Sequence, residues 1–219
     1  MQINNSPKRD INFKAVKVAT AKNTLGKITT DIEIYKLQKE DRSFLENLKK
    51  KTSIKKMYPK LDSLAQARWQ HIFEYCINNI LDSFGNRNTA YLAVKNKKPC
   101  GIMTYTDKGS ELYLDGICSI PIEENKKVSL VGKTLFLQFF KDLEKSKAKK
   151  ATLSAVNDGP FNVVKKYQEL GFVKDMTTHP YSLMVCNKYK AKEQQSKLSK
   201  VIDYTNSPTC KINLEDITD

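Results

Sequence analysis

Alternating polar and apolar residues predict short β-strands along much of the chain. One clear strand is at residues 31–37, and a shorter strand at residues 13–19 would precede it. The other predicted strands lie at residues 89–94, 99–106, 112–120, 151–156, 172–175 and 181–186. The first three of these are separated by short polar turns, which indicates an antiparallel meander. Pro121 ends the 112–120 strand, because proline has no N–H group to donate to a sheet.

Apolar residues spaced three and four positions apart predict four helices. These helices lie at residues 40–51, 63–84, 135–147 and 160–170. The helix at 135–147 has a wide apolar face made of Leu135, Phe136, Phe139, Phe140 and Leu143. Gly171 ends the last helix, and a weaker helical pattern follows at residues 194–202.

The order of these elements is strand, two helices, three-strand meander, helix, strand, helix and two strands. This order predicts an α+β fold with a mixed sheet of about seven strands, most of them antiparallel. The strands at 112–120 and 151–156 are joined through a helix. They should therefore form one parallel pair with a right-handed crossover.

The length of 219 residues fits one domain with appendages. Residues 1–30 are expected to be an N-terminal extension, residues 31–189 the folded domain and residues 190–219 a polar C-terminal tail. No apolar run approaches the roughly 20 residues of a membrane span, and no signal peptide is recognisable. We therefore expect a cytoplasmic protein without a membrane partner. The five cysteines form no CxxC pair, so neither a metal site nor a disulfide framework is indicated.

The formal net charge of +14 suits an anionic partner such as RNA, DNA or a phosphorylated cofactor. Only four of the 38 basic residues are arginines, and proteins that recognise nucleic acids tend to use arginine for bidentate contacts. Codon bias toward lysine therefore explains the charge as well as a nucleic-acid partner does.

One stretch combines a strand, a charged loop and a helix, between residues 112 and 147. The N–H groups at the start of such a helix point beyond the strand, where an anion binds. Gly132 has no Cβ and lets the backbone come close to a ligand, while Lys127 and Lys133 add positive charge. The backbone N–H groups expected to bind a phosphate belong to Val128, Ser129, Leu130, Val131, Gly132 and Lys133.

Over residues 31–187, these elements and motifs resemble the GNAT superfamily of acyl-CoA N-acyltransferases. The acetyl-CoA motif of the superfamily is Gln or Arg, two residues, Gly, one residue, then Gly or Ala. Lys127 stands at its first position and Gly132 at its last, whereas Leu130 replaces the first glycine. Asn157 follows the 151–156 strand, and residues 167–172 match the Tyr-x-x-x-Gly-Phe signature that ends the next helix.

The resemblance implies acetyl-CoA as co-substrate, no metal, and helices on both faces of a sheet whose parallel strands splay apart. The pantetheine arm would lie beside Ile117, Cys118 and Ser119. Asn157 would hydrogen-bond this arm or cap the following helix. A positive φ costs a branched residue far more than glycine. We therefore expect Leu130 either to have an ordinary α-region backbone or to weaken cofactor binding.

The implied reaction is direct attack of a primary amine on the acetyl thioester. Tyr167 matches the general acid of the superfamily, with a packing role in the core as the alternative. The amine would lose its proton to Asp115 or Glu111, and backbone N–H groups near Cys118 and Ser119 would stabilise the oxyanion. Strand alternation places both carboxylates on one face with Tyr113 and Ile117, unless a bulge intervenes.

Three functions are compatible with these residues. The first is an N-acetyltransferase acting on an amine of unknown identity, in a small molecule or a protein. The second is an acetyltransferase acting on aminoacyl-tRNA, which the net charge would favour. The third is a catalytically impaired module of the same fold that binds acyl-CoA or regulates a partner, which Leu130 would favour. Each of them is compatible with a homodimer.

Overall fold

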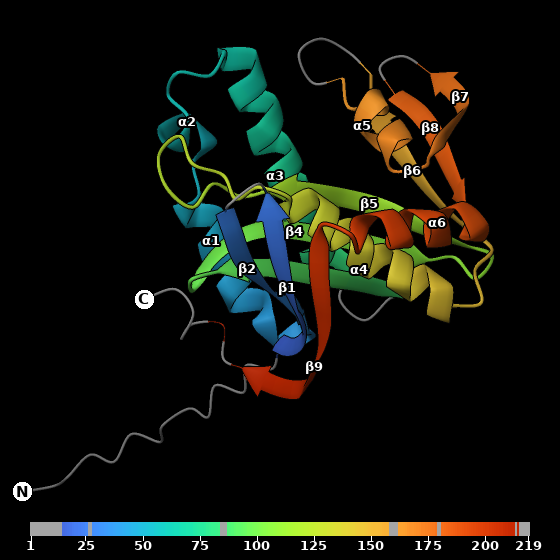
Figure 1. The fold of residues 1–219 in the computed structure, drawn as a ribbon. Coiled ribbons are helices and arrows are strands. Elements are labelled where there is room, and N and C mark those ends of the chain that lie inside the picture. Colours follow the sequence, from blue (N-terminus) through green and yellow to red (C-terminus); the bar gives the residue numbers. More distant parts are fainter. Residues whose placement is uncertain are drawn as a thin grey trace, which may run out of the picture.

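The described residues form one nine-stranded mixed sheet with helices on both faces (Figure 1). The structure is a computed structural model that describes residues 15–25, 28–83, 87–157, 162–178, 181–212 and 214. The strand order is β7-β8-β6-β5-β4-β3-β2-β1-β9. Within the described residues, β5 and β6 are parallel and the other neighbours are antiparallel. The α+β fold and the parallel pair are therefore confirmed.

The strands and helices have well-defined bounds in the described residues. The strands are β1 Ala15–Leu25, β2 Ile28–Lys36, β3 Asn88–Lys95, β4 Lys98–Asp107, β5 Glu111–Ser119, β6 Lys150–Val156, β7 Val173–Thr178, β8 Tyr181–Asn187 and β9 Ile202–Ile212. The helices are α1 Arg42–Lys51, α2 Ile54–Met57, α3 Ser63–Ser83, α4 Val131–Lys145, α5 Val164–Glu169 and α6 Lys188–Leu198, with a 3-10 turn at Lys39–Asp41 before α1. None of these helices is both long and apolar enough to cross a membrane.

Two hydrophobic clusters cover the two faces of the sheet. The α4-side cluster is centred on the predicted apolar face of α4, where Phe136, Phe139 and Phe140 are buried. The α3-side cluster holds Phe73 and Ile77 of α3 together with residues of α1 and the sheet. Each helix buries one apolar stripe against the sheet. Because the stripes of α3 and α4 belong to different clusters, the two helices lie on opposite faces.

A buried polar network fixes the position of α4. Tyr91 of β3 and Tyr105 of β4 donate hydrogen bonds of 2.8 Å and 3.0 Å to Asp142. Gln138 donates a third, of 2.9 Å, and is itself hydrogen-bonded to Tyr204 of β9. Burial raises the pKa of Asp142, and these hydrogen bonds offset part of the rise.

In the part of the chain that the structure describes, the sheet has nine strands, whereas the sequence pattern predicts about seven. The additional strands come from the segments expected to be an extension and a tail, because β1 pairs with both β2 and β9. The inward residues of β1 are small, with Ala15, Ala19 and Ala21 fully buried. A pattern that relies on large apolar side chains therefore predicts only the short strand at residues 13–19, whereas β1 extends to Leu25. The residues of these segments that lie outside the described residues are 1–14, 26–27, 213 and 215–219.

Candidate functional site

The two parallel strands separate halfway along β5. They pair from Glu111 and Lys150 to Leu114 and Leu153, and beyond this point the remaining residues of each strand have no register with the other. Figure 1 shows β6, β8 and β7 turned away from β5 and α3 beyond the paired ends. The predicted splayed pair is therefore present.

A β-bulge lies where the separation begins. Thr104 of β4 is opposite Gly116, whereas Tyr105 is opposite Leu114, so Asp115 is an extra residue in β5. Such a bulge bends its strand and resets the alternation of side chains. Consequently Ile117 packs against the α4-side cluster and Cys118 belongs to the α3-side cluster. The expectation that Ile117 shares a face with Tyr113 is wrong for this reason.

A cavity of ≈ 950 Å³ occupies the space between the separated strands. Residues of α3 form one wall, and residues of α5 together with the start of α4 form another. Of the predicted site residues, those lining the cavity are Asp115, Ile117, Cys118, Ser119, Lys127, Gly132, Lys133 and Tyr167. The remaining predicted residues, Glu111, Val128, Ser129, Leu130, Val131 and Asn157, are not among the lining residues.

The start of α4 opens onto this cavity. A Cβ added to Gly132 would meet no atom within 4 Å, so a ligand has room to approach the backbone there. The first N–H groups of an α-helix have no partner within the helix. Val131 itself is buried, as is Val128 in the preceding loop, and both side chains belong to the α4-side cluster. Their side chains anchor the turn and do not line the cavity.

Leu130 immediately precedes α4 and has a left-handed backbone, with φ 63° and ψ 4°. Its carbonyl accepts hydrogen bonds of 2.8 Å from the Thr134 N–H and 3.0 Å from Thr134 Oγ1. The left-handed conformation costs a residue with a Cβ roughly 1–2 kcal/mol. The expectation of an ordinary α-region backbone at Leu130 is therefore wrong, and weakened cofactor binding remains as the prediction.

Tyr167 lies on the α5 wall, and its ring packs against the edges or faces of two phenylalanine rings that also contact each other. The ring centroids are 5.8 Å from that of Phe136 and 6.1 Å from that of Phe172. Burial raises the pKa of Tyr167 above its usual value of 10, and Cys76 and Cys118 raise it further. The hydroxyl therefore remains protonated at neutral pH.

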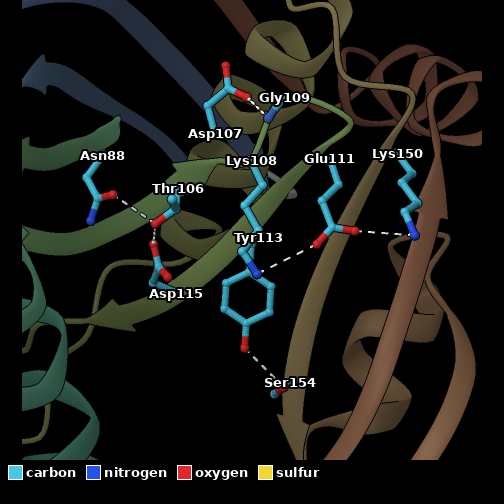
Figure 2. A network of polar contacts seen from close by, with 10 residues as sticks. All are labelled: Asn88, Thr106, Asp107, Lys108, Gly109, Glu111, Tyr113, Asp115, Lys150 and Ser154. Atoms are coloured by element: carbon cyan, nitrogen blue, oxygen red, sulfur yellow. Dashed lines mark hydrogen bonds and ion pairs between the residues drawn. The ribbon is translucent and has the colours of Figure 1, made fainter. Parts of the chain in front are cut away.

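The two candidate carboxylates have different surroundings (Figure 2). Asp115 Oδ2 accepts a hydrogen bond of 2.8 Å from Thr106, whose hydroxyl also lies 2.9 Å from Asn88 Oδ1. Burial raises the pKa of Asp115, and the hydrogen bond from Thr106 offsets part of that rise. Glu111 forms ion pairs with Lys150 at 3.3 Å and Lys108 at 3.7 Å, as Figure 2 shows. Of these two carboxylates, Asp115 lines the cavity and Glu111 does not.

Two further candidates are held by other contacts. Asn157 Nδ2 donates a hydrogen bond of 2.8 Å to Ser182 Oγ of β8, which directs its amide toward that strand.

Burial raises the pKa of the Cys118 thiol to about 12. A thiol with such a pKa is almost entirely protonated at neutral pH and is a poor nucleophile.

The α3 wall contains residues that the sequence analysis did not select. Arg68, His71 and Tyr75 of α3 line the cavity, as do Lys166 and Glu169 of α5. Positions 68, 71 and 75 share one helix face through steps of three and four. That spacing was visible in the sequence, but only the apolar residues of this segment were used, to predict a helix at residues 63–84.

No family model matches the sequence, and no curated protein matches it either. Among solved structures, an aminoglycoside 6'-acetyltransferase type Ii is similar, with a TM-score of 0.52 and 11% identity over 71% of this chain and 96% of that one. The structure of apo FdhC, described as a nucleotide-linked sugar GNAT, has a TM-score of 0.51 and 13% identity over 85% of this chain and 97% of its own. The chain therefore has the fold of the GNAT superfamily, and the splayed parallel pair that the resemblance implies is present in it.

Proposed function

We propose that the protein is an N-acetyltransferase that transfers an acetyl group from acetyl-CoA to a primary amine by direct attack. The observation that carries this proposal is the cavity between the splayed ends of β5 and β6, with Tyr167 on one wall and Asp115 on another. The catalytic unit is residues 31–189, and strands β1 and β9 extend its sheet.

The residues at the start of α4 suit the phosphates of acetyl-CoA. Lys127 and Lys133 line the cavity, and the open backbone at Gly132 admits a phosphate close to the first N–H groups of the helix. Backbone from Ile117 to Ser119 has no partner strand on the β6 side among the described residues. The amide groups of a pantetheine arm can pair with such an edge.

The reaction needs one group to accept a proton and one to donate a proton. The amine nitrogen attacks the thioester carbonyl carbon, forming a C–N bond, and its proton passes to Asp115 directly or through water. The C–S bond then breaks, and Tyr167 donates its proton to the leaving thiolate. Burial raises the pKa of Cys118 to about 12 in the same region. Burial also raises the pKa of Tyr167, and a thiolate formed in the same surroundings becomes a stronger base than in water, which favours its protonation.

The Tyr167→Phe substitution tests the proposal in a thiol-release assay. The phenyl ring keeps its packing between Phe136 and Phe172, so we expect acetyl-CoA still to raise the melting temperature. The value of kcat should fall by about 10²- to 10⁴-fold, the usual contribution of a general acid. Tyr189→Phe is the matched control, because Tyr189 is 82% exposed and does not line the cavity.

A binding or regulatory module is the second candidate, because Leu130 has a strained backbone where the acetyl-CoA motif has glycine. The two candidates differ in one measurable respect. A module would bind acetyl-CoA without releasing thiol across a broad panel of primary amines, whereas an enzyme would release thiol with at least one class of amine. Absence of any thermal shift with acetyl-CoA would contradict both.

A further inference from the structure

The edge of β5 beyond Leu114 directs only some of its backbone groups toward the cavity. In an antiparallel pair of strands, opposite residues alternate between pairs that exchange hydrogen bonds and pairs that do not. The Ile120 N–H donates to the Cys100 carbonyl at 2.8 Å, so this pair is a hydrogen-bonded one. Ser119 is one position before Ile120 and Ile117 is three, so the N–H and C=O groups of both point away from β4. They face the space that opens where the pairing of β5 with β6 ends.

Trp69 of α3 occupies the carbonyl of Ser119. Its Nε1–H donates a hydrogen bond of 2.8 Å to this oxygen, and the Cys118 thiol donates a second one of 3.3 Å. A carbonyl oxygen has two lone pairs, so these two donors take both of its acceptor positions. Within the described residues, the carbonyl that this edge still offers to a ligand is that of Ile117, together with the N–H groups of Ile117 and Ser119.

Packing holds the indole of Trp69 in this place. Its ring centroid is 5.0 Å from that of Tyr58, which follows α2. Further along α3, Cys76 lies so close to Gly116 that a Cβ there would come within 2.7 Å of its sulfur. Helix α3 thus contacts β5 at two separate points, which set both its rotation and its direction. The indole N–H therefore stays directed at its acceptor, on a wall of the cavity that Trp69 itself lines.

The position of the open carbonyl matters because an extended pantetheine arm pairs with β5 as a strand does. The amide N–H groups of the arm need acceptors, and acceptors on one edge of a strand repeat every second residue, about 7 Å apart. If the Ser119 carbonyl were open, the arm could pair one repeat further from Asp115 and carry the thioester about 7 Å away from that residue. A displacement of about 1 Å can already lower a reaction rate about 10²-fold.

We infer that Trp69 is a positioning residue, which fixes the register of the pantetheine arm on β5 by closing the Ser119 carbonyl. The amide of the arm nearest the thioester donates to the Ile117 carbonyl, and a carbonyl of the arm accepts from the Ser119 N–H. This inference rests on the proposed function, because it concerns how acetyl-CoA lies in the cavity. It applies to an enzyme and to a binding module alike.

Deuterium exchange of the indole N–H tests the inference in the unmodified protein. Trp69 is the single tryptophan of the chain, so its indole N–H gives one side-chain signal in the NMR spectrum of 15N-labelled protein. The hydrogen bond to Ser119 should slow its exchange at least about 10-fold relative to a free indole. Saturation with CoA should keep or increase this protection. Faster exchange in the CoA complex would mean that the arm displaces the indole from the carbonyl, which overturns the inference.

The Trp69→Phe variant removes the donor and keeps an aromatic ring beside Tyr58. We compare two acetyl donors, with the most reactive amine of the panel as acceptor. The phosphates of acetyl-CoA hold its register at the start of α4, so its kcat and KM should change little. S-acetylpantetheine has no phosphate and should also bind in the shifted, unreactive register. Unreactive binding lowers kcat and KM by the same factor, here about 2- to 10-fold, which is what one hydrogen bond contributes to an equilibrium constant.

Tyr58→Leu is the matched control, because it loosens the packing of the same indole and leaves the N–H donor in place. This variant should affect the two acetyl donors equally. Parallel falls in kcat and KM that are confined to S-acetylpantetheine and to Trp69→Phe support the inference. An equal loss of kcat/KM with both donors in Trp69→Phe would mean that Trp69 only supports the fold, and the inference would be wrong.

Failure of the inference can be distinguished from failure of the proposed function. If CoA does not bind, the proposed function fails and the inference fails with it. If CoA binds and no amine releases thiol, the protein is not an acetyltransferase, and the deuterium exchange of the indole N–H decides on the register. If thiol is released while CoA speeds the exchange of the indole N–H, the protein is an acetyltransferase and the inference is wrong.

Discussion

Asn23 and Thr134 are hydrogen-bonded to each other in the interior of the protein, and so connect β1 to the first turn of α4. Asn23 Nδ2 donates to Thr134 Oγ1 at 3.0 Å, and both residues are almost fully buried. Thr134 also donates to the Leu130 carbonyl, so the same hydroxyl contacts the turn that precedes the helix. Strand β1 therefore helps to position the proposed phosphate-binding turn.

The Asn23→Ala variant should weaken this connection. We expect a loss of about 1–3 kcal/mol in the free energy of unfolding, because a buried hydrogen-bonding group loses its partner. The KM for acetyl-CoA should rise several-fold with little change in kcat. Ser207→Ala is the control, since its contact of 3.5 Å with Thr20 joins β1 to β9 away from α4. An unchanged KM would show that β1 stabilises the fold without positioning the turn.

Replacing Leu130 separates backbone strain from side-chain packing. Leu130→Gly removes the cost of the positive φ, whereas Leu130→Ala removes most of the side chain and keeps that cost. We expect the glycine variant to be more stable than the alanine variant by about 1 kcal/mol and to bind acetyl-CoA several-fold more tightly. Calorimetry and titration of both variants measure this difference. Equal affinities would mean that the strain does not affect the cofactor.

The pH dependence of kcat/KM should identify the base. Only the deprotonated carboxylate accepts a proton from the amine, so activity should fall as the pH drops through the pKa of Asp115. Burial raises that pKa, which places the loss above the usual carboxyl value of about 4. Asp115→Asn should remove this acid limb and lower kcat by about 10²- to 10⁴-fold.

Glu111→Gln is the comparison for the pH profile, because Glu111 is paired with two lysines outside the cavity lining. The acid limb should persist in this variant. If the limb disappears in Glu111→Gln and remains in Asp115→Asn, the roles of the two carboxylates are reversed.

Close packing at Gly101 should affect the N-terminal end of α4, where the proposed phosphate-binding turn leads into the helix. A Cβ at Gly101 would come within 2.3 Å of Val131 Cγ1, so Gly101→Ala must displace the first residue of the helix. Overpacking of this kind typically costs about 1–3 kcal/mol. We expect a lower melting temperature and weaker acetyl-CoA binding. Adding Val131→Ala makes room for the new methyl group and should restore both. A double variant as impaired as Gly101→Ala would contradict this explanation.

Much of the fold could be predicted from hydrophobic periodicity. The apolar face of α4 identifies it as a helix, and because α4 joins β5 to β6, the parallel pair could be predicted. Strand β1 could be predicted only in part, as a short strand at residues 13–19, because its fully buried residues are alanines and polar residues follow them to its end. Its partner β9 is polar and could be identified only from the pairing itself.

The candidate site could be predicted less completely than the fold. The motif around Gly132 and the position of Tyr167 led to residues that do line the cavity. The bulge at Asp115 has only a weak signal in the sequence, which is Gly116 directly after the extra residue, since a glycine inside a strand often marks a bulge. The α3 wall was missed because Arg68 and Tyr75 are far from β5 in sequence, and only tertiary packing brings them to the cavity.

During translation, β1 is made long before β9, the strand with which one of its edges pairs. Thr20 and Ser207, whose side chains are in contact between these strands, are 187 positions apart in the sequence. At a translation rate of about 5–20 residues per second, β9 is made roughly ten to forty seconds after β1. An unpaired strand is a template for aggregation in that interval, and charged side chains such as Lys17 and Lys22 discourage it. Because β2 directly follows β1 in the chain and pairs with one of its edges, these lysines suit a nascent strand whose other edge stays exposed until β9 is made.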